Sequence, residues 1–220
     1  MTPQEAIKIQ QELRHKVVIQ KFDREVTYIG GADVSLNMFS KTIYAGIIVL
    51  KFPELTPVTH AVVQSETTFP YIPGLLSFRE APALIECWNK LTIKPDVLMV
   101  DGQGIAHPRR IGIASHIGVL LDIPTIGCAK SPLYGDFEEV SKVVGSMSYI
   151  HDRYSKHEIL GVAYRSKERS KPLIISPGHR MDVENVFSIT KECVKKYRLP
   201  EPTRLAHDLV NKFRTGEITE

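Results

Sequence analysis

The feature that most constrains the fold is a short apolar run, Val97-Leu98-Met99-Val100, that ends on Asp101. A run of strand length without polar alternation is typical of a β-strand that is buried on both faces. In open α/β sheets, the carboxyl ends of such strands carry the chemistry. Asp101 is therefore predicted to be a charge held at the mouth of a sheet, with Arg109 and Arg110 shortly after it. A metal ion or a phosphate suits this arrangement better than a hydrophobic core does.

The composition is that of an ordinary globular protein, with 43% hydrophobic and 24% charged residues among 220. We expect one domain over residues 1–220. The net charge of +3 predicts no global attraction for nucleic acid, so such binding would need local patches. Cys87, Cys128 and Cys193 are too scattered for a disulfide framework or a zinc site. Because neither a signal peptide nor a membrane-spanning run is apparent, we expect a cytoplasmic protein, monomeric and without an obligate protein partner.

The apolar patterning predicts a mixed sheet whose first three strands are antiparallel, because short turns join them. A strand, a helix and another strand then follow at the spacing of a parallel βαβ unit. This order predicts the α/β class and a ribonuclease H-like domain: a central mixed sheet with three antiparallel N-terminal strands followed by parallel strands, flanked by helices. The expected strands cover 28–36, 43–52, 58–67, 97–101, 124–129, 143–150, 159–164 and 173–176, the expected helices cover 2–15, 77–91, 112–121, 181–197 and 203–214, and 176–179 is expected to be a turn.

Four acidic or imidazole residues stand where a sheet enzyme needs them: Asp33, Glu80, Asp101 and His207. The first and fourth strands are neighbours in this fold, so Asp33 and Asp101 are expected to converge. Two close carboxylates repel each other unless a cation lies between them, and hard oxygen ligands select Mg²⁺ or Mn²⁺. Taken singly, each has a structural alternative, such as a hydrogen-bonded strand aspartate or a solvated helix glutamate. Together they favour a metal site.

Two further features point to nucleic acid. Tyr71 lies between Pro70 and Pro73, which predicts a rigid, exposed aromatic ring that can insert into a base stack. The alternative is a tyrosine that packs on its own sheet. Lys130 ends a predicted strand and can reach a phosphate as a point charge. Gly102-Gln103-Gly104 has the spacing of neither a P-loop nor a dinucleotide fingerprint, so a nucleotide cofactor is not predicted.

These segments resemble the endonuclease V family of inosine-directed nucleases, in the same order and over nearly the whole chain. The most specific motif is the proline-framed tyrosine followed by Phe78-Arg79-Glu80. The matching segments are Gly31-Ala32-Asp33-Val34, Pro70-Tyr71-Ile72-Pro73-Gly74, Phe78-Arg79-Glu80, Asp101-Gly102-Gln103-Gly104, Ala106-His107-Pro108-Arg109, Gly112-Ile113-Ala114-Ser115-His116, Pro124-Thr125-Ile126-Gly127, Ala129-Lys130, Ser176-Pro177-Gly178-His179 and Glu201-Pro202-Thr203-Arg204-Leu205-Ala206-His207.

The resemblance implies Mg²⁺-dependent DNA repair, with cleavage of the second phosphodiester 3′ to a deaminated adenine that leaves a 3′-hydroxyl and a 5′-phosphate. It implies that Asp33 and Asp101 bind the metal, completed by Glu80 and His207, and that Lys130 contacts the scissile phosphate. Mn²⁺ is expected to substitute for Mg²⁺. The implied substrate contacts are a strand-separating wedge of Pro70, Tyr71, Ile72 and Pro73, a base pocket of Gly74, Leu76, Gly112, Ile113 and Leu133, and His116.

Three alternatives to this reading stay open. The physiological strand can be RNA, because no residue recognisably reads a 2′-hydroxyl. A ribonuclease H-like nuclease can instead act on junctions or hybrid duplexes. A binding module for modified bases with a vestigial metal site is disfavoured, because mere binding has no use for clustered carboxylates near phosphate.

Overall fold

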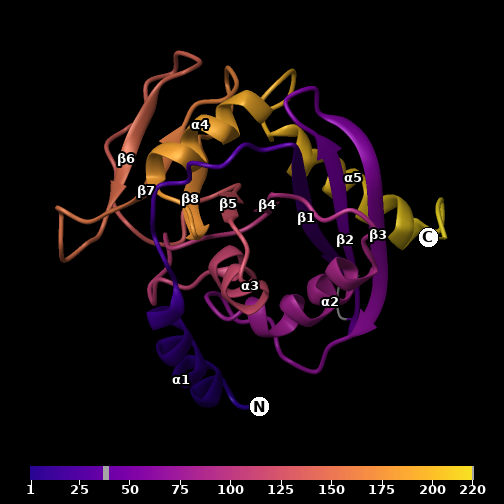
Figure 1. Cartoon of the computed structure of the whole chain (residues 1–220). Coiled ribbons are helices and arrows are strands. Elements are labelled where there is room, and N and C mark those ends of the chain that lie inside the picture. The colour runs from indigo at the N-terminus through magenta and orange to yellow at the C-terminus, as the bar shows by residue number, and fades with distance from the viewer. Residues whose placement is uncertain (37–39, 220) are drawn as a thin grey trace.

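The fold is built on one eight-stranded mixed sheet with helices on both faces (Figure 1). The computed structural model describes residues 1–36 and 40–219. Its strands are β1 (Tyr28–Leu36), β2 (Thr42–Lys51), β3 (Thr56–Glu66), β4 (Val97–Val100), β5 (Thr125–Ala129), β6 (Met147–His151), β7 (Ile159–Tyr164) and β8 (Leu173–His179). Its α-helices are α1 (Pro3–Leu13), α2 (Ser77–Lys90), α3 (Ile113–Leu121), α4 (Val183–Cys193) and α5 (Glu201–Thr215), and a short 3₁₀ turn covers Arg14–Lys16.

The strand order is β3-β2-β1-β4-β5-β8-β7-β6. β1 pairs antiparallel with β2 and parallel with β4, and β4 pairs parallel with β5. The predicted ribonuclease H-like arrangement is therefore confirmed. The parallel part ends at β5, because β8 pairs antiparallel with β5, and β7 and β6 continue antiparallel. The central position of β1 and β4 is what brings Asp33 and Asp101 together.

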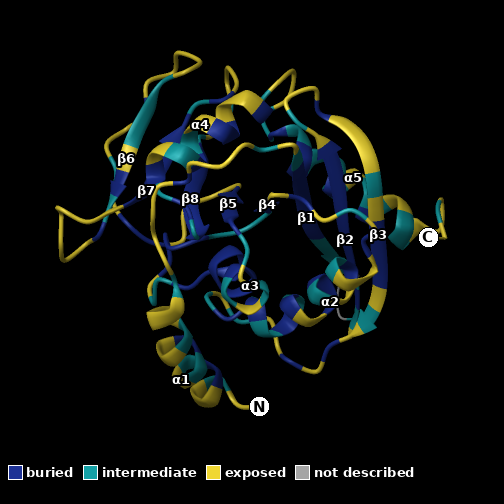
Figure 2. Ribbon diagram, in the orientation of Figure 1, coloured by how far each residue is buried: buried dark blue, intermediate teal, exposed yellow. Residues whose placement is uncertain are grey.

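The sheet is buried on both faces because its central strands are apolar on both sides. Met99 belongs to the cluster under α4 and α5, whereas Leu98 and Val100 belong to the cluster under α2 and α3. Figure 2 shows the same layering: the central strands are buried, and the edge strand β3 carries the exposed residues. The run before Asp101 is apolar without interruption because helices cover β4 on both faces, as its sequence predicted.

The N-terminal helix α1 begins as its sequence predicted. The Thr2 hydroxyl accepts a hydrogen bond from the Glu5 backbone N–H at 3.3 Å, and the Glu5 carboxylate accepts one from the Thr2 N–H at 2.7 Å. This reciprocal capping box satisfies two donors that no helix can satisfy internally. Ala6 then packs α1 against Phe69 and Leu75, so the helix covers the proline-rich segment before α2.

Three expected elements differ from the structure. The predicted turn at 176–179 is wrong, because these residues continue β8; a register shift between Thr125 and Ile126 of β5 accommodates Pro177, which has no N–H for the ladder. The strand expected over 143–150 begins only at Met147, because Ser146 N–H closes a turn on the Val143 carbonyl. The helix expected over 181–197 is shorter: the Asp182 side chain caps its start, and the chain turns extended at Val194.

Within the described residues, no helix has both the length and the apolar character that a membrane span requires.

Candidate active site

Asp33, Asp101 and His207 meet at the centre of the sheet. Asp33 lies in the middle of β1, and Asp101 directly follows β4, where its backbone N–H bonds the Ala32 carbonyl at 3.0 Å. α5 crosses over β1 and carries His207. One ligand atom from each of the three side chains lies within 4.8 Å of the other two. The predicted convergence of the two carboxylates is therefore observed, and a histidine joins them.

The electrostatics of this cluster disfavour three negative charges in one buried place. Burial, followed by repulsion from Asp101, raises the pKa of Asp33 to about 6. Burial, followed by the charge of Asp33, raises the pKa of Glu80 to about 7. Glu80 lies in the first turn of α2, outside the group of three side chains that converge within 4.8 Å, but close enough for the charges of Asp33 and Asp101 to act on it. The carboxylates at this site repel one another, and a bound cation would reduce that repulsion.

Lys130 supplies one positive charge to this site. Its ammonium forms an ion pair with the Asp101 carboxylate. Burial is the largest single influence and lowers the pKa of Lys130, but the charge and hydrogen bond of Asp101, together with the charge of Asp33, outweigh it, so the pKa is raised and the lysine stays protonated. The backbone of Lys130 is also fixed, because the Arg198 guanidinium donates to its carbonyl at 2.6 Å. Arg198 was not predicted from the sequence.

His207 is held in one tautomer by a chain of side chains. The Ser35 hydroxyl donates to the Asn211 amide oxygen at 3.2 Å, so the Asn211 nitrogen faces His207 Nε2 at 3.0 Å as a donor. Nε2 is then the acceptor, and Nδ1 carries the proton that it donates to Asp33 Oδ2 at 2.8 Å. A cation between His207 and Asp33 would take the place of this proton.

The donor set fits a divalent cation. Two aspartates and one histidine have ligand atoms within 4.8 Å of one another, and a glutamate lies nearby. The carboxylates are hard oxygen ligands that suit Mg²⁺ or Mn²⁺, and the histidine adds one borderline nitrogen ligand. The raised pKa of Asp33 supports this fit, because the cost of ionising it beside Asp101 falls when a positive charge lies between them.

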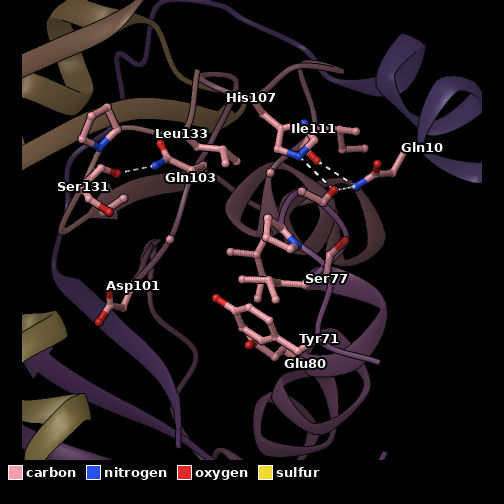
Figure 3. A pocket seen from close by; sticks show the side chains of 18 residues that line it. Gln10, Tyr71, Ser77, Glu80, Asp101, Gln103, His107, Ile111, Ser131 and Leu133 are labelled. Carbon is pink, nitrogen blue, oxygen red and sulfur yellow. Dashed lines mark hydrogen bonds between the residues drawn. The ribbon is translucent and has the colours of Figure 1, made fainter. Parts of the chain in front are cut away.

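A cavity of about 230 Å³ opens beside the acidic cluster (Figure 3). Its volume is several times the ~30 Å³ that one water occupies in the liquid. Glu80 and Asp101 lie in its wall. Of the expected substrate residues, the structure brings seven together here: Tyr71, Pro73, Gly74, Leu76, Gly112, Ile113 and Leu133.

Tyr71 is exposed, as its sequence predicted, with 65% of its surface accessible. Its neighbours divide between two environments. Pro70 is exposed and lies outside the cavity lining, whereas Ile72 packs against Ala6, Phe69 and Leu75 beneath α1. The loop therefore presents one aromatic ring to solvent and anchors itself through an aliphatic side chain.

His116 does not take the place expected of a substrate contact. Its Nδ1 bonds the Ser77 hydroxyl at 2.8 Å, and its ring meets the Phe78 ring edge-on with centroids 5.1 Å apart. Burial lowers the pKa of His116 to about 4, so the imidazole is neutral near pH 7. Because Ser77 lines the cavity and His116 lies behind it, we correct the expected role to support of Ser77.

Other cavity residues were missed by the sequence reasoning. Gln10 reaches the cavity from α1, and His107 and Gln103 reach it from the segment after β4. Gln103 donates to the Ser131 carbonyl at 2.8 Å and so ties the two loops that border the site. The Ala106–Arg109 motif was a signal for His107, but Gln10 gave none, because it occupies an ordinary position of an amphipathic helix.

Comparison with known proteins agrees with the geometry. The family model described as Endonuclease V matches residues 11–208. Endonuclease V of Dictyoglomus turgidum is 47% identical over 98% of this chain and 92% of its own length. The solved structure of endonuclease V from Streptomyces avermitilis is 35% identical, with a TM-score of 0.90 over 98% of this chain and 94% of that one. Endonuclease V from Ciona intestinalis, solved in complex with a 24mer DNA containing an inosine followed by a ribo-adenosine, is 28% identical with a TM-score of 0.85, covering 98% of both chains.

The family match assigns the chain to the nuclease class of hydrolases, and its mixed sheet carries two carboxylates at the central strands. Within that class, the chain belongs to the endonuclease V family. It is accordingly an endonuclease, and the resemblance that its motifs suggested is confirmed.

Proposed function

We propose that the protein cleaves nucleic acid beside a deaminated adenine in DNA repair, using the acidic cluster as its catalytic centre. One observation carries the proposal: Asp101 belongs to the acidic cluster and also lines the cavity, which Glu80 lines as well. A base held in the cavity therefore places its own strand against the carboxylates. The Ciona relative, whose structure contains inosine DNA, supports the choice of base.

The proposed catalytic residues act on the phosphate and on the metal. Asp33, Asp101 and His207 would hold Mg²⁺, or Mn²⁺ in its place, with Glu80 completing the site. Such a metal supplies an activated water and stabilises the leaving oxygen. Lys130 exchanges its ion pair with Asp101 for a phosphate oxygen when the strand binds, because both partners are negative charges within its reach.

The proposed base recognition uses backbone donors. Ile113 is the first residue of α3, so its N–H has no acceptor within the helix. Hypoxanthine presents a 6-oxo acceptor where adenine presents an amino donor, and a backbone N–H can donate a hydrogen bond only to the former. A site that leaves a buried donor unpaired rejects the wrong base strongly, by about 10⁴-fold in well-studied enzymes. Tyr71, exposed at the rim, would stack on or separate the neighbouring bases.

The finer features of the reaction follow the family resemblance. We infer cleavage at the second phosphodiester 3′ to the deaminated base, with 3′-hydroxyl and 5′-phosphate products. We also infer one domain over residues 1–220, since one sheet runs through the structure. We further infer a monomeric protein and a cytoplasmic location; the location is supported by three buried, free cysteines of the kind that a reducing compartment preserves.

The test is a side-by-side cleavage assay on matched strands that carry deoxyinosine in DNA, inosine in RNA, or adenine as the control. Each strand is incubated with Mg²⁺ and with a chelator, and the products are mapped by length and end group. We expect cleavage of the deaminated strands alone, only with Mg²⁺, one nucleotide beyond the lesion. Equal cleavage of the adenine strands, or of undamaged junctions and hybrids, contradicts the proposal. Binding without any cleavage in Mg²⁺ contradicts the assignment of the catalytic centre.

A further inference from the structure

The carbonyl of Gly74, in the wall of the cavity, is held by three donors from two distant segments. Gln10 Nε2 and His107 Nε2 each lie 3.0 Å from this oxygen, and Arg109 Nη2 lies 2.8 Å from it. We call this set of donors, Gln10, His107 and Arg109, the Gly74 clamp. Figure 3 shows Gln10 and His107 converging on the same oxygen from opposite sides.

The donors of the Gly74 clamp also orient one another. Arg109 Nε donates to the Gln10 amide oxygen at 2.5 Å, which fixes the Gln10 nitrogen toward Gly74. The Arg109 backbone N–H donates to His107 Nδ1 at 3.1 Å, so the His107 proton sits on Nε2 and points at Gly74. Each polar group of the Gln10 amide therefore has a partner, as a side chain that is only 1% exposed requires.

Glycine is favoured at position 74 chiefly by its backbone conformation, and the space around it is limited. Its φ of +81° lies in the left-handed region that other residues adopt at a cost. A Cβ there would also lie 3.1 Å from Arg109 Nη2 and 3.4 Å from His107 Nε2. The loop and the Gly74 clamp are thus fitted to each other, and neither can shift without breaking several hydrogen bonds at once.

Gln10 contacts both sides of the cavity. Its Nε2 also donates to the Ile111 carbonyl at 3.3 Å, directly before Gly112 and Ile113 of the facing wall. A single buried amide therefore bridges the loop at 73–76 and the start of α3, which are the two sides between which the base would lie. The spacing between these two walls depends on the length of that amide.

We propose that Gln10 is a positioning residue that sets the width of the base pocket and thereby the preference for the deaminated base. This inference rests on the proposed function, since it concerns the pocket that function assigns. In this proposal Gln10 does not contact the base, and it influences base binding only by holding the Gly74 loop and the start of α3 at a fixed distance. Losing two buried hydrogen bonds that define the spacing is expected to weaken inosine binding about tenfold or more.

The test measures binding without cleavage. A labelled single strand with one inosine is compared, by fluorescence anisotropy in chelator, with the same strand carrying an abasic site or adenine. In the Gln10→Leu variant, affinity for the inosine strand should fall about tenfold while affinity for the abasic strand stays within twofold. Gln11→Leu is the matched control, because Gln11 is exposed on the same helix, and it should behave as wild type. Arg109→Lys, which cannot bind Gln10 and Gly74 together, is the second variant should Gln10→Leu fail to fold.

The outcomes separate the two proposals. A wild-type protein that binds inosine no better than the abasic strand overturns the proposed function. A wild-type protein that prefers inosine, together with a Gln10→Leu variant that keeps the same preference, overturns the role of Gln10 alone. An equal loss on both strands also overturns it, because a general structural defect would lower both affinities together.

Discussion

Replacing Gly31 by alanine is expected to impair the proposed active site by displacing α5. Gly31 lies in β1, and α5 passes so close to it that a Cβ would stand 1.9 Å from the Pro202 carbonyl oxygen. Cβ contacts under 3.0 Å essentially do not occur in proteins. The first turn of α5 therefore has to move by about 1.1 Å, the difference between these two distances, and backbone cannot swing away as a flexible side chain can.

The movement reaches the site because α5 also carries His207, whose Nδ1 lies 2.8 Å from Asp33. A displacement of about 1 Å in a catalytic group can cost about 100-fold in rate. We expect Gly31→Ala to lower kcat on an inosine strand by about that factor. We also expect a loss of stability of about 1–3 kcal/mol, which is the usual range for forced overpacking.

The assay compares kcat and urea unfolding of the variant with those of Gly30→Ala. A Cβ on Gly30 would meet side-chain atoms of Leu98 and Pro95, each at 2.8 Å, and not the backbone of α5. We expect Gly30→Ala to lose stability but to keep kcat within a few-fold of wild type. A Gly31→Ala protein with wild-type kcat and an unchanged unfolding midpoint would refute the reasoning, because α5 would then not be held against β1 at this distance.

Three further predictions follow from individual side chains. Asp101→Ala should abolish cleavage of inosine strands in Mg²⁺ while binding largely survives; full activity would remove Asp101 from the catalytic centre. Tyr71→Ala should weaken binding to inosine duplex more than to an inosine single strand, which has no stack to open; equal losses in anisotropy titrations would argue against a wedge. For His116, the folded pKa of about 4 lies below the unfolded value of 6.5, so its contribution to stability is present above pH 6.5 and is lost as pH falls toward 4. Urea titrations of His116→Gln should show that acid loss reduced by about 3 kcal/mol relative to wild type; an identical pH profile would contradict a buried neutral imidazole.

The convergence of Asp33 and Asp101 could be predicted because the apolar pattern and the chain order determine which strands are neighbours. The run before Asp101 is apolar on both sides, so its strand is central, and the chain order then places β1 beside β4. The position of Asp33 close to Asp101 follows from the pairing of β1 with β4. His207 is a candidate only in combination with the three carboxylates, since an isolated histidine on a helix carries no signal of its own, and the family resemblance strengthens it.

The Gly74 clamp could not be predicted because its contacts are distant in sequence. Gln10 is 64 residues from Gly74 and 101 from Ile111, and no periodicity links them. The turn expected at 176–179 failed for a different reason. Proline and glycine usually end strands. Here the register shift in β5 leaves Pro177 at a position of β8 where no backbone N–H is needed for a hydrogen bond to β5.

The most direct test of the acidic cluster as a metal-binding catalytic centre is calorimetric titration of Mn²⁺ into wild-type protein and into Asp33→Asn. Asp33 is the buried carboxylate that faces both Asp101 and His207, and its asparagine variant keeps the side chain's shape while removing the charge. We predict saturable binding to wild type near pH 7.5, and at least a tenfold weaker affinity in Asp33→Asn. Equal affinity in both proteins would contradict the claim that these carboxylates hold the catalytic metal.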